Sequence, residues 1–104
     1  MMNFIKNLFG NTNTNNLSEI IAQGAFLVDV RTTQEFAESK IKGAVNIPLD
    51  KIALQIEKFK NKNNIVVFCR SGNRSGQAKA ILERSGIINV INGGSFGNIK
   101  QYVK

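Results

Sequence analysis

The stretch IVVFCRSGNRSGQAKAIL, residues 65–82, is the most informative segment for predicting the fold. Its first five residues are apolar and end on Cys69, which predicts a strand buried on both faces, because a half-exposed strand would alternate apolar and polar residues. Polar residues and Gly72 follow, and a helical pattern begins near Ser75. A buried strand that turns sharply into a helix indicates a parallel sheet covered by helices.

On both sides of this stretch, apolar runs and helical patterns alternate along the chain. Strands are expected at 25–30, 44–48, 65–69 and 87–92, and helices at 18–23, 33–40, 49–59, 75–85 and 93–104. Strands this apolar need helices on both faces, so the sequence predicts an α/β class and a three-layer α/β/α domain with a mostly parallel sheet. Ligands of such open sheets bind beyond the carboxyl ends of the strands, where Asp29 and Cys69 are expected.

Polar residues and glycines mark the ends of these helices. The expected N-caps are Ser18, Thr32 or Thr33, Asp50 and Ser75. Gly24 and Gly86 follow helices and are expected to end them.

Residues 1–16 differ in composition from the rest. Apolar residues within 4–9 fit one face of a helix closed by Gly10, and NTNTNN at 11–16 is a polar linker, so the folded domain is expected at 17–104. The leading helix either docks on its own domain or binds a membrane surface or partner. The first ten residues lack the features of a secretory signal. The longest apolar run falls far short of the roughly 20 residues that cross a bilayer.

The composition narrows the function classes. At 104 residues the chain is one domain, and a net charge of +7 favours anionic partners. Nucleic acid is not expected, because the lysines in 51–62 lie on a solvated helix without interleaved aromatics. The absence of histidine removes the usual imidazole base and most zinc chemistry, so any catalysis must use cysteine, carboxylates or arginine. A single cysteine fits a reducing compartment, and we expect a cytoplasmic protein.

Cys69 has two interpretations. It either completes an apolar strand or is a nucleophile held by the loop that follows. A tight turn into a helix aims backbone N–H groups inward and adds the positive end of the helix dipole. Arg70 and Arg74 add two charges, and together these effects favour a thiolate at neutral pH. No GxxxxGK[ST] phosphate loop is present.

The chain resembles the rhodanese family through signatures in the family's order. The loop reads CRSGNRS, which resembles the family's active-site pattern of Cys, Arg, any residue, Gly, any residue, Arg and Ser or Thr. VDVRTTQEF and IKGAVNIPL resemble its two upstream signatures, and VINGG its glycine pair before the last helix. The resemblance covers 17–104. It implies a small α/β domain and a sulfurtransferase that acts through a persulfide of Cys69, with no metal or organic cofactor.

The resemblance also implies a set of site residues. Cys69 would be catalytic, and a small anionic sulfur donor would be bound by Arg70, Ser71, Gly72, Asn73 and Arg74. Around them, the supporting residues would be Asp29, Arg31, Glu35 and Ser75. Either arginine of the loop could instead brace it through a carboxylate. The donor would be thiosulfate or similar, and the acceptor a thiol or cyanide.

Two alternatives use the same kind of loop. One is a non-catalytic sulfur carrier or a sensing and interaction module. The other is a phosphatase or arsenate reductase. The loop from Cys69 to Arg74 has six residues, as in sulfur-transferring members, whereas the loops of phosphatases and arsenate reductases have one residue more.

The chain departs from the rhodanese pattern in two places. It has Ser39 and Lys40 where many members have Gly-His. It also lacks the tryptophan that usually follows the glycine pair, and the nearest aromatic residue is Phe96. The sequence indicates no oligomeric state.

Overall fold

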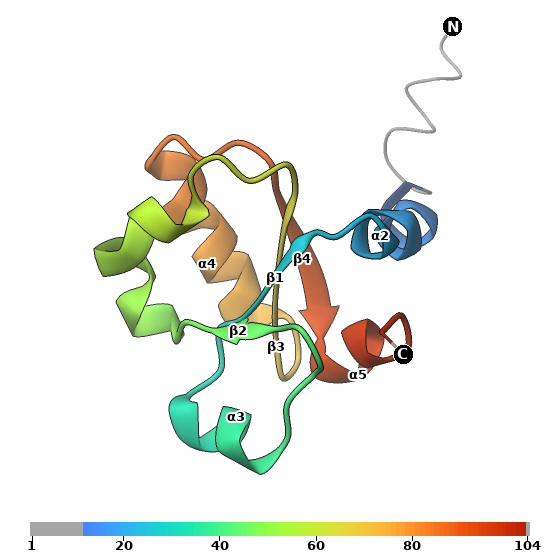
Figure 1. The fold of residues 1–104 in the computed structure, drawn as a ribbon. Coiled ribbons are helices and arrows are strands. Elements are labelled where there is room, and N and C mark those ends of the chain that lie inside the picture. Colours follow the sequence, from blue (N-terminus) through green and yellow to red (C-terminus); the bar gives the residue numbers. More distant parts are fainter. Residues whose placement is uncertain (1–11, 104) are drawn as a thin grey trace, which may run out of the picture.

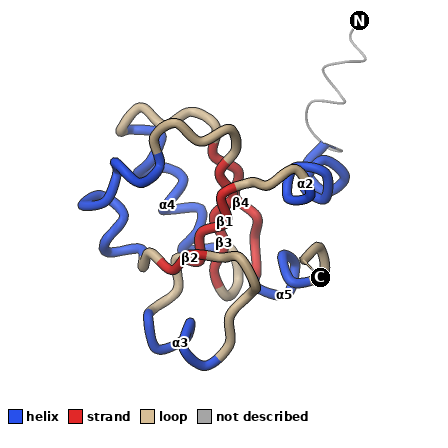
Figure 2. The backbone as a smooth tube through the Cα atoms, in the orientation of Figure 1, coloured by secondary structure: helices blue, strands red, loops and turns tan. Residues whose placement is uncertain are grey.

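The structure of the protein is a computed structural model, in which residues 12–103 are described. Its strands are β1 (Phe26–Asp29), β2 (Val45–Asn46), β3 (Ile65–Cys69) and β4 (Val90–Ser95). Its helices are α2 (Thr12–Ala22), α3 (Thr33–Glu38), the 3₁₀ helix η2 (Leu49–Phe59), α4 (Asn73–Arg84) and α5 (Phe96–Lys100). All strand pairs are parallel, in the order β2-β1-β3-β4. Figures 1 and 2 show this sheet between two groups of helices.

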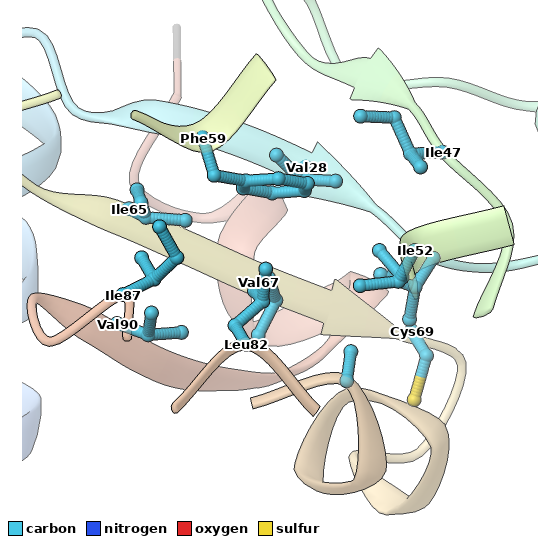
Figure 3. Close-up of a cluster of buried hydrophobic side chains, with 12 residues drawn as sticks. Val28, Ile47, Ile52, Phe59, Ile65, Val67, Cys69, Leu82, Ile87 and Val90 are labelled. Carbon is cyan, nitrogen blue, oxygen red and sulfur yellow. The ribbon is translucent and has the colours of Figure 1, made fainter. Parts of the chain in front are cut away.

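The sheet separates two hydrophobic clusters, because successive side chains of a strand point to opposite faces. β3 is buried throughout and supplies residues to both clusters. Toward η2 and α4 the buried cluster contains Val28, Val30, Ile47, Ile52, Phe59, Ile65, Val67, Cys69, Ala78, Leu82, Ile87 and Val90, most of them labelled in Figure 3. Toward α2 and α5 it contains Leu17, Leu27, Ile41, Val66, Phe68 and Ile99. The expected three-layer α/β/α class is confirmed.

Helix α2 is longer than the helix that the sequence pattern predicts there. The predicted linker at 11–16 and the predicted cap at Ser18 are wrong for the described part, because α2 begins at Thr12 and places Ser18 within the helix. Each asparagine destabilises a helix by only about 0.7 kcal/mol relative to alanine. The side chain of Leu17, 4% exposed, packs in the cluster on this face of the sheet and stabilises the helix there. The predicted leading helix at 1–10 lies outside the described residues. No helix within residues 12–103 is long and apolar enough to span a membrane.

The segment 49–59 is helical as predicted, but it is not one α-helix. It forms 3₁₀ turns with a non-helical residue at Gln55, and Pro48 takes the N-cap position that we expected for Asp50. A 3₁₀ helix repeats every three residues, so Ile52 is buried while Ala53, which an α-helix would turn inward, is exposed.

The glycine pair lies in a strand, whereas the sequence pattern placed it in the last helix. β4 runs through Gly93 to Ser95, and α5 starts at Phe96 with Ser95 as its N-cap. The register with β3 shifts at this point, so that Val67 pairs with Asn92 and Phe68 with Gly94. Glycine is needed at 93 because a Cβ there would lie 2.7 Å from both Ile99 Cδ1 and Val66 Cγ1.

Gly93→Ala is therefore expected to destabilise the domain by about 1–3 kcal/mol, the usual cost of overpacking a core. Urea unfolding followed by far-UV circular dichroism measures the change. Gly97→Ala is the matched control, because a Cβ at this α5 position meets nothing closer than 4.0 Å. Equal stability of the two variants would contradict the packing described for Gly93.

Candidate active site

Cys69 ends β3 on the face covered by η2 and α4, and the residue is fully buried. Figure 3 shows its sulfur pointing toward the first turn of the following helix. The chain reverses at Gly72, whose φ of +102° is a left-handed conformation that glycine adopts without strain. Helix α4 starts at Asn73, two residues before the predicted start, so Asn73 and Arg74 belong to its first turn.

The sulfur of Cys69 accepts hydrogen bonds from the loop and the helix. The amide of Gly72 lies 3.0 Å and that of Ser75 3.4 Å from Sγ, and Ser75 Oγ lies 3.5 Å away. Burial raises the pKa of the thiol, but hydrogen bonds from Ser75, Gly72 and the Ser71 amide outweigh it, so that the pKa is below its ordinary value. The apolar and nucleophilic interpretations of Cys69 are therefore compatible, since its carbon packs in the core while its sulfur faces these donors.

Ser75 is not the helix cap that we expected. Gly72 takes the N-cap position, and the buried Ser75 hydroxyl lies 3.0 Å from Gly72 O and 2.7 Å from Asn92 Oδ1. The sequence alone does not identify Asn92 of β4 as a site residue. The only sequence feature that points to it is its place as a polar residue directly before the glycine pair. The Ser75 hydroxyl on α4 therefore lies between Gly72 O of the cysteine loop and Asn92 of the neighbouring strand.

A buried ion pair supports the end of β1. Arg31 Nη2 lies 2.6 Å from Asp29 Oδ2, and Nε donates to both carboxylate oxygens at 2.9 Å. The same Nη2 donates to Ser39 O, and the guanidinium lies 4.5 Å from the centre of the Phe96 ring. Asn46, a second residue that the sequence did not indicate, donates from Nδ2 to the carbonyl oxygens of residues 29 and 31. Asp29 and Arg31, two of the expected supporting residues, therefore form an ion pair with each other.

Glu35 links helix α3 to the cysteine loop. Its carboxylate binds Arg74 at 2.8 and 3.1 Å, and it completes a capping box with Thr32, which resolves the choice between the two threonines. The hydrogen bond from Arg74, followed by that from the Thr32 amide, lowers the pKa of Glu35 to about 2. The ion pair raises the pKa of Arg74. Arg74 therefore braces the loop through a carboxylate, one of the two roles left open for it.

The Glu35 pair makes stability depend on pH. Its folded pKa of about 2 lies below the unfolded value of about 4.3, so the stabilisation is complete above about pH 5 and is lost as pH falls toward 2. Glu35→Gln is expected to lower the unfolding free energy at pH 7 by about 1 kcal/mol, because the pair is partly exposed. The difference from wild type should shrink between about pH 5 and 2 in urea titrations.

Glu38→Gln makes the same change on an exposed residue of the same helix and serves as the control. A constant difference between wild type and Glu35→Gln across this pH range would contradict the role given to the ion pair.

A cavity of about 280 Å³ opens in front of this network. Its lining consists of Arg31, Glu35, Glu38, Ser39, Arg70 and Phe96. Arg70, which lines this cavity, is exposed, and so are the loop residues Ser71 and Asn73. The two departures from the rhodanese pattern lie near this opening: the Phe96 ring covers Arg31, and Lys40 Nζ lies 5.1 Å from the centre of the Phe36 ring. Within residues 12–103, no three His, Cys, Asp or Glu side chains gather as a metal site requires.

The arrangement matches known proteins in sequence and in structure. The family model of the Rhodanese-like domain matches residues 13–98. The thiosulfate sulfurtransferase PspE of Escherichia coli is 38% identical over 74 residues, which cover 69% of this chain and 71% of that protein. A sulfurtransferase of Allochromatium vinosum is 36% identical over 67% of this chain and 65% of its own length.

Among solved structures, the human single-domain sulfurtransferase TSTD1 superposes with a TM-score of 0.67 at 28% identity, over 84% of this chain and 91% of that one. The agreement therefore extends over most of the chain. The chain belongs to the family of rhodanese-like domains.

Proposed function

We propose that the protein is a sulfurtransferase that moves sulfane sulfur from thiosulfate, or a similar donor, to a thiol or to cyanide through a persulfide on Cys69. The observation that carries this proposal is the sulfur of Cys69 at the focus of the Gly72 amide and the Ser75 amide and hydroxyl. Donors aimed in advance at a reacting sulfur stabilise its negative charge without reorganisation. Family membership and the sulfurtransferases among its relatives support the same reaction class.

The reaction needs only the thiolate and the two substrates. The thiolate of Cys69 attacks the outer sulfur of thiosulfate, forming a new S–S bond while the bond to the sulfonate sulfur breaks. Sulfite leaves with that electron pair. An acceptor thiolate or cyanide then attacks the outer sulfur of the persulfide, and the Cys69 thiolate is regenerated. No net oxidation occurs and no cofactor is required.

The two loop arginines take different roles in this proposal. Arg74 is held by Glu35, so it fixes the first turn of α4 and the loop before it. Arg70 is exposed and lines the cavity, where it attracts the anionic donor. In this proposal, stabilisation of the transferred sulfur is assigned to the amides of 70–74, of which that of Gly72 donates to Cys69 Sγ. The Asp29–Arg31 pair supports the cavity wall. The lone thiol fits a reducing compartment such as the cytoplasm.

Intact-mass spectrometry after incubation with thiosulfate tests the proposal. We expect the protein to gain the mass of about one sulfur atom and to lose it on addition of cyanide, with release of thiocyanate. A persulfide that forms but is not passed to cyanide or to any thiol would favour the sulfur-carrier alternative. Failure to gain mass would contradict both roles.

A further inference from the structure

Asn92 contacts the hydroxyl that faces the reactive sulfur. Its Oδ1 lies 2.7 Å from Ser75 Oγ, and its Nδ2 donates to Gly72 O at 3.3 Å. The amide of Gly94 donates to the same Oδ1 at 2.9 Å. This last contact fixes the orientation of the side-chain amide, because a flip would set its NH₂ group against the N–H of Gly94. Asn92 therefore presents an acceptor to Ser75.

The hydroxyl of Ser75 has one proton and three acceptors within reach. These are Asn92 Oδ1 at 2.7 Å, Gly72 O at 3.0 Å and Cys69 Sγ at 3.5 Å. The carbonyl of Gly72 already accepts from the amide of Gly76 and from Asn92. The short contact to Asn92 is thus the favoured destination of the proton while Cys69 is a thiol.

The same hydroxyl must behave differently once Cys69 is ionised. A neutral S–H can donate to a lone pair of Ser75 Oγ, whereas a thiolate needs the hydroxyl proton turned toward itself. Turning it breaks the hydrogen bond to Asn92. After sulfur transfer the inner sulfur of the persulfide is uncharged, and the proton can return to Asn92.

We propose that Asn92 is a positioning residue that competes with the Cys69 sulfur for the proton of the Ser75 hydroxyl. It thereby stabilises the states in which Sγ is uncharged, the thiol and the persulfide, and limits how far the loop favours the thiolate. The role of this competition in catalysis rests on the proposed sulfur transfer, whereas its effect on the ionisation of the Cys69 thiol does not depend on that transfer.

Two of the arginines of the site, Arg31 and Arg74, are held in ion pairs. Arg74 of α4 is paired with Glu35 of α3, and Arg31 with Asp29 of β1. Arg70 is exposed on the loop. The other two elements packed against Cys69 present uncharged groups to it: β4 pairs it with Ser95, and η2 contributes Ile52 to its cluster. Within residues 12–103, the hydrogen bonds of the Asn92 side chain join it to uncharged groups.

The test is the pH dependence of alkylation of Cys69 by iodoacetamide, which reports the thiolate of the only cysteine. Asn92→Ala frees the hydroxyl proton for Sγ, so the midpoint should fall by about one pH unit. Asn92→Asp keeps an acceptor and adds a negative charge, so its midpoint should rise. A merely structural role predicts the opposite for alanine, because a loosened loop aims its donors less well.

A double-mutant cycle isolates the path through the hydroxyl. In a Ser75→Ala background, Asn92→Ala should leave the midpoint unchanged, since no hydroxyl proton remains to be shared. A rise or no change in the single Asn92→Ala variant, or an undiminished fall in the Ser75→Ala background, would overturn the proposal. If Asn92→Ala does not fold, a midpoint for Asn92→Asp at or below that of wild type overturns it instead. The assay contains no sulfur donor, so failure of the sulfur-transfer proposal stays a separate result.

Discussion

Replacing Cys69 by serine is expected to abolish sulfur transfer, with a loss of about a thousandfold or more in cyanide-dependent thiocyanate release from thiosulfate. Cys69 is the only cysteine of the chain, so no second thiol can carry the sulfur. A hydroxyl in its place stays protonated at neutral pH and is a poor nucleophile toward sulfur. The structure gives it no histidine to act as a base, because the chain has none.

The comparison needs proof that the serine variant still folds, which thermal unfolding provides. Leu54→Ala, at a side chain that is 80% exposed on η2, controls for handling and should keep full activity. Thiocyanate release by the serine variant at the wild-type rate would remove the persulfide mechanism.

The largest expected effect on stability is that of Asp29→Asn. The change leaves the guanidinium of Arg31, only 5% exposed, without its counter-charge. Removing one partner of a buried ion pair costs about 3–5 kcal/mol, and a domain of this size has only about 5–15 kcal/mol of stability. Urea unfolding should therefore show a much lower midpoint.

The double variant Asp29→Leu/Arg31→Met removes both charges and is the matched control. It should be clearly more stable than Asp29→Asn, because apolar residues can replace a buried ion pair at little cost. An unfolding free energy of Asp29→Asn within about 0.5 kcal/mol of wild type would show that the pair does not support the fold as described.

The α/β class could be predicted because burial on both faces leaves a strong pattern in 65–69 and in the strand before it. Helix boundaries could not be predicted as well, since they depend on contacts between distant segments. Leu17 anchors a helix through a polar stretch that looks like a linker. Likewise, Gly93 belongs to a strand because of the close approach of Val66 and Ile99, which no local pattern reveals.

The same limit applies to the site. Cys69, its loop and the carboxylates at 29 and 35 follow from motif and strand-end position. The choice of partner does not: Arg74 could have bound substrate, and only the distance to Glu35 shows that it is paired. Asn92 lies 17 residues from the hydroxyl that it contacts, so the register of β4 against β3 brings the two together.

Titration of the Cys69 thiolate by its ultraviolet absorbance in the wild-type protein, with Cys69→Ser as the blank, shows whether the donors around the sulfur ionise it. The hydrogen bonds from Gly72 and Ser75 predict a midpoint clearly below the ordinary cysteine value of about 8.5. A midpoint at or above that value would show that burial outweighs these donors and that Cys69 is a core residue without a nucleophile's charge.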